Sequence, residues 1–506
     1  MTGRPGPEPH LQPTAPSRQG DTMDTLHPTE PGVPTPDAVA TLATGPTDAP
    51  GPTNAPGAAT EAGHGVSRRR FLGLAGGAAL VAGVGTWSGR VLAPEQVASA
   101  ADAPANLYLA GTDGWIHLPP TPAIPPYHPD PLAPAGLTTY VFGFRNVTGM
   151  TTTQRLAQKN KAQHSAPLFW VDQYDPNAHN EFRVQLTNLG LALRPDLFDA
   201  HTLHWHGFRN VIPFFDGEPT GSVSVPAGRE FTYVYRPRDP GTYMFHCHVE
   251  DVEHVHMGMT GLVFVRPLQD GQSKTYQGRT YTKFLYNDGD GSTGHDREFA
   301  MFLSEVWAEA HWADAHIQLP EWSDYRADFA LLNGRVYPDT IEPNGPSVDA
   351  FHTESGVTFD ASGDLIPPAG RPDLQYQPNS SLVRCNSGER VALRFANLGF
   401  REAAMTTSGI RMRVVGRDAT PMRGRDGTDT SYETETLNIG PGESYDVVFT
   451  APARTGSGAY DTYYLYNRAF NRSNNLAPGG FGGQATEIRV YASGVGPQGY
   501  PNDWGN

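Results

Sequence analysis

The chain of 506 residues contains only two cysteines, Cys247 and Cys385. Two thiols can form at most one disulfide, so the sequence excludes the disulfide framework that stabilises many small secreted domains. Histidine is absent after His352. The C-terminal part of the chain therefore cannot supply imidazole ligands to a metal. Cys385 occupies an apolar strand position, where we expect it to act as a small hydrophobic side chain.

Long apolar runs and a positive charge balance are also missing. A glycine-diluted apolar run from Phe71 to about Trp87 is too short and too weak to predict a membrane span. Acidic residues outnumber basic ones by 53 to 37, which gives a formal net charge of −16. This charge repels nucleic acid and anionic membranes, so we expect neither as a partner. Neutral or cationic small molecules remain compatible with it.

The first 100 residues have the composition of a leader followed by an export signal. Residues 1–66 are rich in Pro, Thr, Ala and Gly, which predicts disorder, and translation could start at Met23 or later. Residues 67–100 resemble a twin-arginine signal peptide, with RRRFL at 68–72 and a cleavage site at 98–100. We expect export to an extracellular, cell-wall or periplasmic location, without stable membrane insertion after cleavage. An uncleaved N-terminal anchor is the alternative.

Two stretches concentrate the metal-binding side chains, HTLHWHG at 201–207 and HCHVEDVEHVHMGM at 246–259. In a strand, side chains two positions apart share a face, so each HxH pair presents two neighbouring imidazoles. A thiolate, two imidazoles and a weak axial methionine form the ligand set of a blue-copper centre. Zinc also binds cysteine and histidine, usually in a closed tetrahedral site. The thioether favours copper.

Both stretches resemble elements of the multicopper oxidase family, laccase-like and of the two-domain cupredoxin type. The resemblance implies a type 1 copper bound by His201, Cys247, His254 and Met259. It implies a type 2 and type 3 copper cluster bound by His204, His206, His246 and His248. The run from Cys247 to His254 is two residues longer than the family pattern, which leaves His256 and Met257 as rival ligands. The intact HxxxGM spacing favours His254 and Met259.

The family resemblance also implies a route for electrons. Cys247 would hold the type 1 copper, while His246 and His248 on either side of it would point to the opposite face of the strand. An electron from a donor would then cross a few bonds to the cluster. These three residues are the expected catalytic centre.

The part of the chain after the signal alternates short apolar strands with Gly, Pro and Asp clusters, which predicts an all-β protein. Its segments repeat at an offset of about 200 to 220 residues: NEFRVQLTNLG at 180–190 resembles GERVALRFANLG at 388–399. We therefore expect two Greek-key cupredoxin-like β-sandwich domains. A copper-binding domain would span 104–268, and a copper-less domain 290–495.

The repeat makes the expected cluster incomplete. The second copy offers Ala403, Thr406 and Ser408 where the first has His201, His204 and His206. It offers Tyr466 and Asn467 where the first has His246 and Cys247. Half of the eight imidazoles of a full cluster are therefore missing from one chain. Other candidate ligands are His117, His128, His164, His179, His311, His316 and His352. The HWADAH segment at 311–316 is otherwise expected to be a polar surface or turn element.

The leading hypothesis is an exported copper-dependent oxidoreductase that takes electrons from a phenol-like or metal-ion donor at type 1 copper and reduces dioxygen. A nitrite reductase-like enzyme and a non-catalytic type 1 copper protein are the alternatives, and a homotrimer is possible. Ten methionines without a methionine-rich insert give no sign of a cuprous-ion oxidase. Glu250, Asp251 and Glu253 are candidate proton-relay residues or solvated loop charges. Asp216 resembles a residue of a family loop near the donor or water path, and its alternative role is that of a turn residue before Gly217.

Overall fold

The computed structural model describes residues 104–504, except 122, 166, 210, 347–358, 473–474 and 476–480, and these described residues belong to one compact unit. The expected leader, signal peptide and cleavage site, and also His352, lie outside the described residues. Within the described part of the chain, every helix is too short or too polar to cross a membrane.

Two four-stranded sheets form a first β-sandwich. One sheet contains, in spatial order, β2 (Thr139–Asn146), β1 (Leu107–Ile116), β4 (Phe182–Gly190) and β6 (Glu230–Tyr235). The other contains β3 (Phe169–Asp172), β8 (Thr260–Arg266), β7 (Gly241–His246) and β5 (His204–His206). The pairs β1–β4 and β3–β8 are parallel, and the remaining neighbours are antiparallel.

Two larger sheets form a second β-sandwich. The first has the order β12 (Phe329–Leu332), β11 (Arg297–Val306), β14 (Arg390–Asn397), β20 (Ser444–Thr450), β16 (Met412–Arg417) and β17 (Thr420–Pro421), with β18 (Tyr432–Thr434) also beside β16. The second has the order β13 (Val383–Asn386), β22 (Ala485–Tyr491), β21 (Tyr460–Asn467), β15 (Ala403–Thr407) and β19 (Thr436–Ile439). A hairpin of β9 (Lys274–Tyr276) and β10 (Arg279–Tyr281) precedes this sandwich.

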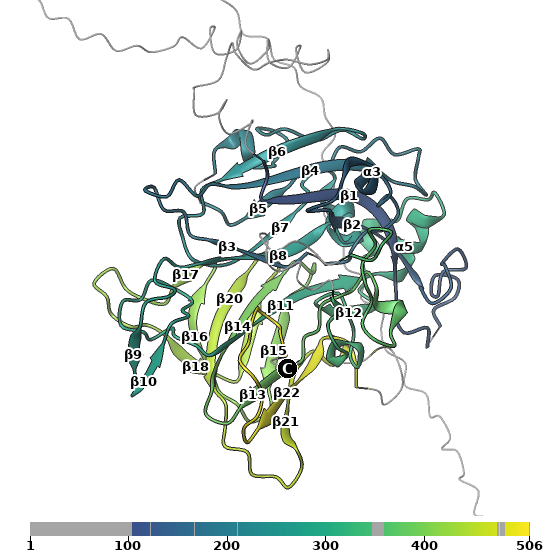
Figure 1. The fold of residues 1–506 in the computed structure, drawn as a ribbon. Helices are drawn as coiled ribbons and strands as arrows, with labels where there is room; N and C mark the ends of the chain where they lie inside the picture. Colours follow the sequence, from purple (N-terminus) through teal and green to yellow (C-terminus); the bar gives the residue numbers. More distant parts are fainter. Residues whose placement is uncertain are drawn as a thin grey trace, which may run out of the picture. The chain divides into compact units, whose positions relative to one another are not determined.

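The strand order repeats between the two sandwiches (Figure 1). The order β2-β1-β4-β6 corresponds to β12-β11-β14-β20, and β3-β8-β7-β5 corresponds to β13-β22-β21-β15. The parallel pairs fall at equivalent places, since β11–β14 and β13–β22 are parallel. The matched segments at 180–190 and 388–399 lie on the equivalent strands β4 and β14. The predicted all-β, cupredoxin-like fold is confirmed, whereas the exact domain boundaries stay a prediction.

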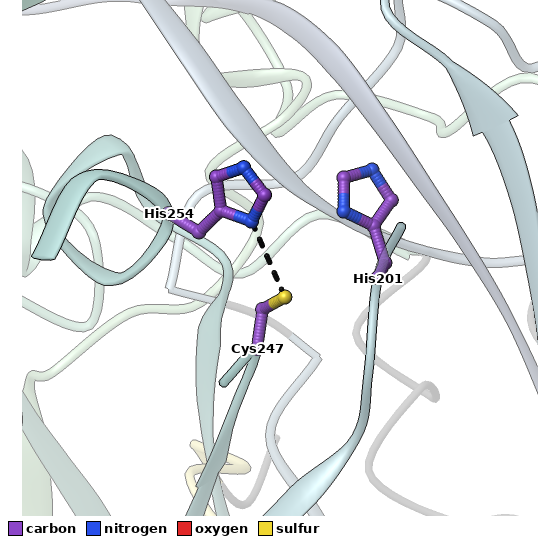
Figure 2. Close-up of side chains that lie close together, drawn as sticks. All are labelled: His201, Cys247 and His254. Carbon is purple, nitrogen blue, oxygen red and sulfur yellow. Dashed lines mark hydrogen bonds between the residues drawn. The ribbon is translucent and has the colours of Figure 1, made fainter. Parts of the chain in front are cut away.

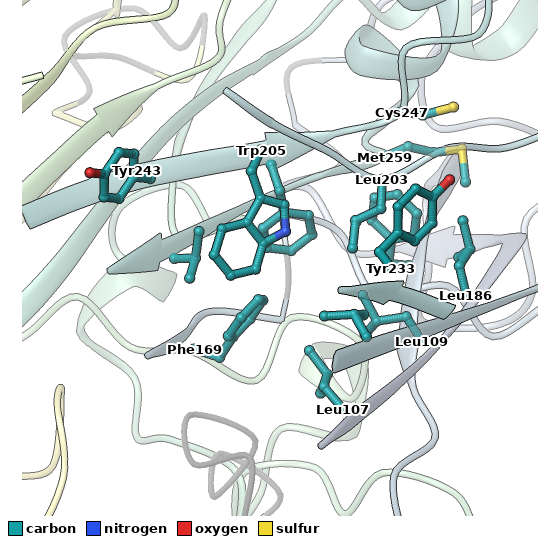
Figure 3. Packing of buried hydrophobic residues seen from close by; sticks show 14 of the residues in the cluster. Leu107, Leu109, Phe169, Leu186, Leu203, Trp205, Tyr233, Tyr243, Cys247 and Met259 are labelled. Atoms are coloured by element: carbon teal, nitrogen blue, oxygen red, sulfur yellow. The ribbon is translucent and has the colours of Figure 1, made fainter. Parts of the chain in front are cut away.

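Each sandwich encloses its own apolar core, because alternate side chains of both sheets point inward. In the first core, Leu109 and Leu186 from one sheet lie in the same cluster as Phe169 and Trp205 from the other (Figure 3). Cys247 and Met259 lie in the same cluster. The second core contains Cys385, which is fully buried as expected for a hydrophobic side chain.

The two sandwiches pack through the sheet that carries β7 and the sheet that carries β14. Leu262 and Phe264 of β8 pack against Phe302 of β11 in a separate apolar cluster. The strand β7 is buried along its whole length, because one face meets the first core and the other meets the second sandwich. Thr242 of this strand donates its hydroxyl to Asp446 of β20 at 2.5 Å.

Helices are few and short. The α-helices are α3 (Thr152–Leu156), α4 (Asp251–Met257) and α5 (Ala308–Ala315), and single 3-10 turns occur at Pro213–Phe215, Trp322–Asp324, Asp339–Ile341, Pro372–Leu374 and Phe470–Arg472. The HWADAH segment was expected to be a polar surface or turn element, and this expectation is wrong. It begins inside α5, and His311 is buried with its Nδ1 2.6 Å from the carbonyl oxygen of Tyr140. Tertiary packing against β2 thus decides the conformation.

Candidate metal centre

The antiparallel pair β5–β7 brings the two histidine-rich stretches together. His204 pairs with His246, and Trp205 pairs with Phe245. Because side chains alternate along each strand, Trp205, Phe245 and Cys247 enter the first core, while the intervening histidines point to the opposite face. One pair of strands therefore presents a thiol on one side and imidazoles on the other.

The thiol side contains a compact group of His201, Cys247 and His254 (Figure 2). Their ligand atoms all lie within 4.8 Å of one another, and all three residues are fully buried. The sulfur of Cys247 is 3.3 Å from Nδ1 of His254. The backbone N–H of Thr202 also donates to this sulfur, at 3.4 Å.

Met259 completes the expected ligand set at the same end of the core (Figure 3). It is fully buried, and its carbonyl oxygen accepts a hydrogen bond from the backbone N–H of Cys247 at 3.1 Å. Gly111 lies against both Met259 and His201: a Cβ atom there would be 3.2 Å from Met259 Cε and 2.7 Å from His201 Cδ2. The absence of a side chain at Gly111 therefore allows these two groups to meet.

The rival ligand His256 lies elsewhere. The extra length between Cys247 and His254 is taken up by the start of α4, where Glu250 adopts a left-handed conformation with φ 46°. His256 accepts a hydrogen bond at Nε2 from the backbone N–H of Trp307 at 3.0 Å, and its ring contacts His311. The helix therefore separates the two histidines, and only His254 approaches the thiol.

The buried group has the chemistry of a cation site. Both ring nitrogens of His201 are buried without a hydrogen-bond partner. Burial opposes ionisation of Cys247, but His254 and His201 together hold the pKa of its thiol well below the usual range. A thiolate, two imidazoles and a thioether fit copper, which favours soft ligands. Metal binding would also satisfy the unpartnered imidazole of His201.

Four imidazoles gather on the other face of the strand pair. The ring centroid of His204 is 5.2 Å from that of His246 and 5.1 Å from that of His248, and the His206 and His246 centroids are 5.8 Å apart. The structure thus brings together all four residues predicted for the cluster. Ligand atoms of His204, His206 and His246 lie within 4.8 Å of one another.

Hydrogen bonds orient two of these rings toward a shared space. Nδ1 of His204 is 2.7 Å from the carbonyl oxygen of Asp216, and Nδ1 of His246 is 2.7 Å from that of Cys247. A carbonyl can only accept, so each Nδ1 carries the proton and each Nε2 lone pair remains available to a metal. Burial lowers the pKa of His204, and lowers that of His246 to about 3, so both rings are neutral ligands near pH 7.

The second sandwich contains a counterpart of the thiol site without its ligands. Thr406 pairs with Tyr466 as His204 pairs with His246, which puts Asn467 at the position of Cys247. Ala404 N donates to Asn467 Oδ1 at 3.2 Å, matching the bond from Thr202 to Cys247. Asn467 in turn donates its side-chain amide to Gln484. A satisfied pair of amides therefore replaces the thiol and the thioether.

The structure places one further residue at the thiol site that the sequence did not indicate. It also shows that the acidic candidates differ in burial. Asp199 Oδ2 lies 3.4 Å from Nε2 of His254, although no motif distinguishes this aspartate in the sequence. Glu250 and Asp251 are exposed, whereas Glu253 has a buried, unpartnered carboxylate oxygen. Asp216 acts through its backbone carbonyl on His204, and its carboxylate lies 3.6 Å from the same ring.

The remaining candidate histidines do not join these groups. Among the described residues, the clusters that could hold a metal include none of His117, His128, His164, His179, His311 and His316. Their positions are dictated by packing or by surface contacts. His316, for example, lies 3.1 Å from a carboxylate oxygen of Asp130.

Comparisons with known proteins identify relatives of both sandwiches. Two different models of the multicopper oxidase family match the chain, at residues 186–270 and 328–493. Multicopper oxidase MmcO of Mycobacterium tuberculosis is 23% identical over 265 residues, covering 50% of this chain and 42% of the relative. Laccase-12 of Arabidopsis thaliana is 23% identical over 285 residues, covering 54% and 38%.

Solved structures resemble the chain at low sequence identity. The blue copper oxidase from Nitrosomonas europaea is 20% identical, with a TM-score of 0.47 over 78% of this chain and 88% of the other. The chain spans only about two fifths of the length of the curated relatives it matches. The two family matches fall one in each sandwich, so segments 186–270 and 328–493 of the chain are similar to multicopper oxidases, a family of copper-dependent oxidoreductases.

Proposed function

We propose that the protein is an exported copper-dependent oxidase that takes electrons singly from a small donor and uses them to reduce dioxygen. The observation that carries this proposal is the buried group of His201, Cys247 and His254, joined to the histidine group on the opposite face through His246. Bound copper would supply one-electron redox chemistry in the first group and dioxygen reduction in the second.

The chain itself provides the path between the two groups. Cys247 and His246 are adjacent in sequence, and the Nδ1–H of His246 donates to the Cys247 carbonyl oxygen. An electron leaving the sulfur therefore meets only covalent bonds and one short hydrogen bond before it reaches the His246 ring. Complete burial of Cys247 keeps water and external oxidants away from the thiolate.

The donor side is the surface next to His254. Asp199 holds the ring at Nε2, and the neighbouring Phe198 is 84% exposed. Val252 of α4, two residues before His254, is also exposed. These two exposed apolar side chains and the carboxylate of Asp199 would suit a neutral or cationic donor, such as a phenol or a metal ion. Export by the twin-arginine route is part of the same proposal.

The experiment is copper loading of the purified chain, followed by visible spectroscopy and oxygen consumption with a phenolic donor or a ferrous salt. We expect a strong thiolate-to-copper band and donor-dependent oxygen uptake. Cys247→Ser should abolish both, whereas Cys385→Ser is the matched control and should retain both. A band without oxygen uptake would favour the electron-transfer alternative. Activity in Cys247→Ser would contradict the proposal.

A further inference from the structure

The second sandwich closes one side of the histidine group of its own chain. A cavity of about 400 Å³ adjoins His206. Its lining includes Arg209 and Tyr243 from the first sandwich, and Asp418 and Gly442 from the second. A neighbouring subunit is not needed to form this wall.

Gly442 is the closest part of the wall. A Cβ atom at this position would lie 2.9 Å from Nε2 and 3.2 Å from Cε1 of His206. The loop is fixed, because the backbone N–H of Gly442 donates to the carbonyl oxygen of Asn397 at 2.8 Å, and Glu443 accepts from Gly440. The positive φ of 78° at Gly442 also favours glycine there.

A tight turn of the second sandwich also packs against the first sandwich on this side of the histidine group. Asp418 and Ala419 form the loop between β16 and β17, with φ values of 48° and 49°. Ala419 packs on the start of β7, since a Cβ atom at Gly241 would lie 2.6 Å from its Cα. Arg209 donates to Thr420 at 2.9 Å across the two sandwiches. Two loops of the second sandwich therefore hold this side of the histidine group in place.

The wall contributes no imidazole, because the chain has no histidine after His352. We infer that His204, His206 and His246 bind a single copper ion within one chain, under the wall formed by Gly442, and do not form half of a multinuclear cluster. The identity of the metal rests on the proposed function. The cavity beside His206 leaves room for water or a small oxidant next to this ion.

His248 is the spare imidazole of the group. Its Nδ1 lies 4.0 Å from a carboxylate oxygen of Asp251, and its side chain is 29% exposed. The group of neighbouring ligand atoms consists of His204, His206 and His246 and does not include His248. A full cluster would need all four of these rings and four more imidazoles, whereas a mononuclear site needs only three rings.

The test measures the copper content and the electron paramagnetic resonance spectrum of the purified full-length chain. Light scattering gives the mass of the oligomer in the same sample. We expect two coppers per chain in any oligomeric state, one with a type 1 signal and one with a type 2 signal. Together they should account for all the copper. Three or more coppers per chain, or a spin-silent coupled pair, would overturn the inference. Such a result would leave the proposed oxidase intact, whereas loss of the type 1 signal would overturn the function instead.

A glycine pair provides matched variants. Gly442→Ala should push His206 aside and lower copper binding at the second site by at least tenfold, with the type 1 band unchanged. Gly228→Ala is the control, because Gly228 makes the equivalent backbone bond to Asn188 and has φ 75°, but its Cβ would meet no atom within 4 Å. His248→Gln should retain both coppers. Retention of the type 2 signal in Gly442→Ala, or its loss in His248→Gln, would refute the assignment.

Discussion

His254 is held at both ring nitrogens, by the Cys247 sulfur at 3.3 Å and by Asp199 at 3.4 Å. Interaction with the thiolate and with Asp199 outweighs burial and raises the pKa of His254 to about 10 in the metal-free chain. A metal ion would take the place of the proton at the sulfur-facing nitrogen. The carboxylate would remain on the outer nitrogen, where it orients the ring and makes it a stronger donor.

Removing the charge of Asp199 should raise the reduction potential of the type 1 centre. A negative charge near the metal favours the oxidised ion, and one charge at such distances is worth about 1 to 4 kcal/mol before screening. We expect Asp199→Asn to shift the potential upward in a redox titration of the visible band. Asp251→Asn, which removes an exposed charge on α4, should shift it less. Equal shifts in both variants would contradict the role of Asp199.

At the scale of elements, the HxH alternation could be predicted from the sequence, because period two in a strand fixes which side chains share a face. The strand pair β5–β7 confirms it. The helix α4 could not be predicted, since seven residues carry no helical periodicity. The contact of Asp199 with His254 joins residues 55 positions apart, and only the fold brings them together.

The contact between β7 and β20 should contribute measurably to stability. Thr242 donates its hydroxyl to Asp446 at 2.5 Å in a fully buried setting. Thr242→Val should lower the free energy of unfolding by about 1 to 3 kcal/mol, because a hydrogen bond to a charged group is lost. Urea denaturation measures this. Thr260→Val on β8 is the control, since the buried hydroxyl of Thr260 has no partner, and an equal loss there would refute the prediction.

For the whole molecule, the repeat predicted two related sandwiches, and their strand orders correspond. That only the first sandwich binds metal stays a prediction. The repeat could not predict that the second sandwich covers the histidines of the first. That arrangement depends on loops at Gly442 and Asp418 whose positions are set by packing between sandwiches. Sequence patterns predict local periodicity. The positions of these loops depend instead on contacts between residues more than 200 positions apart in the sequence.

Acid should destabilise the whole chain partly through His295. Burial lowers the pKa of this ring to about 3, below the ordinary value of 6.5. The unfolded chain then binds a proton that the folded chain does not, so this stability is present above pH 6.5 and is lost as the pH falls. Between pH 7 and pH 5 the loss is about 2 kcal/mol. Glutamine does not bind this proton, so between pH 7 and pH 5 the free energy of unfolding of His295→Gln should fall by about 2 kcal/mol less than that of the wild type. Urea unfolding at both pH values measures this. An equal fall in both proteins would contradict the prediction.

The most direct measurement of the central claim is anomalous X-ray diffraction at the copper edge from crystals of the copper-loaded chain. The account predicts one strong peak among Cys247, His201 and His254, near Met259. It predicts a second peak among His204, His206 and His246. A copper-loaded crystal without a peak at Cys247 would contradict the assignment of the type 1 centre.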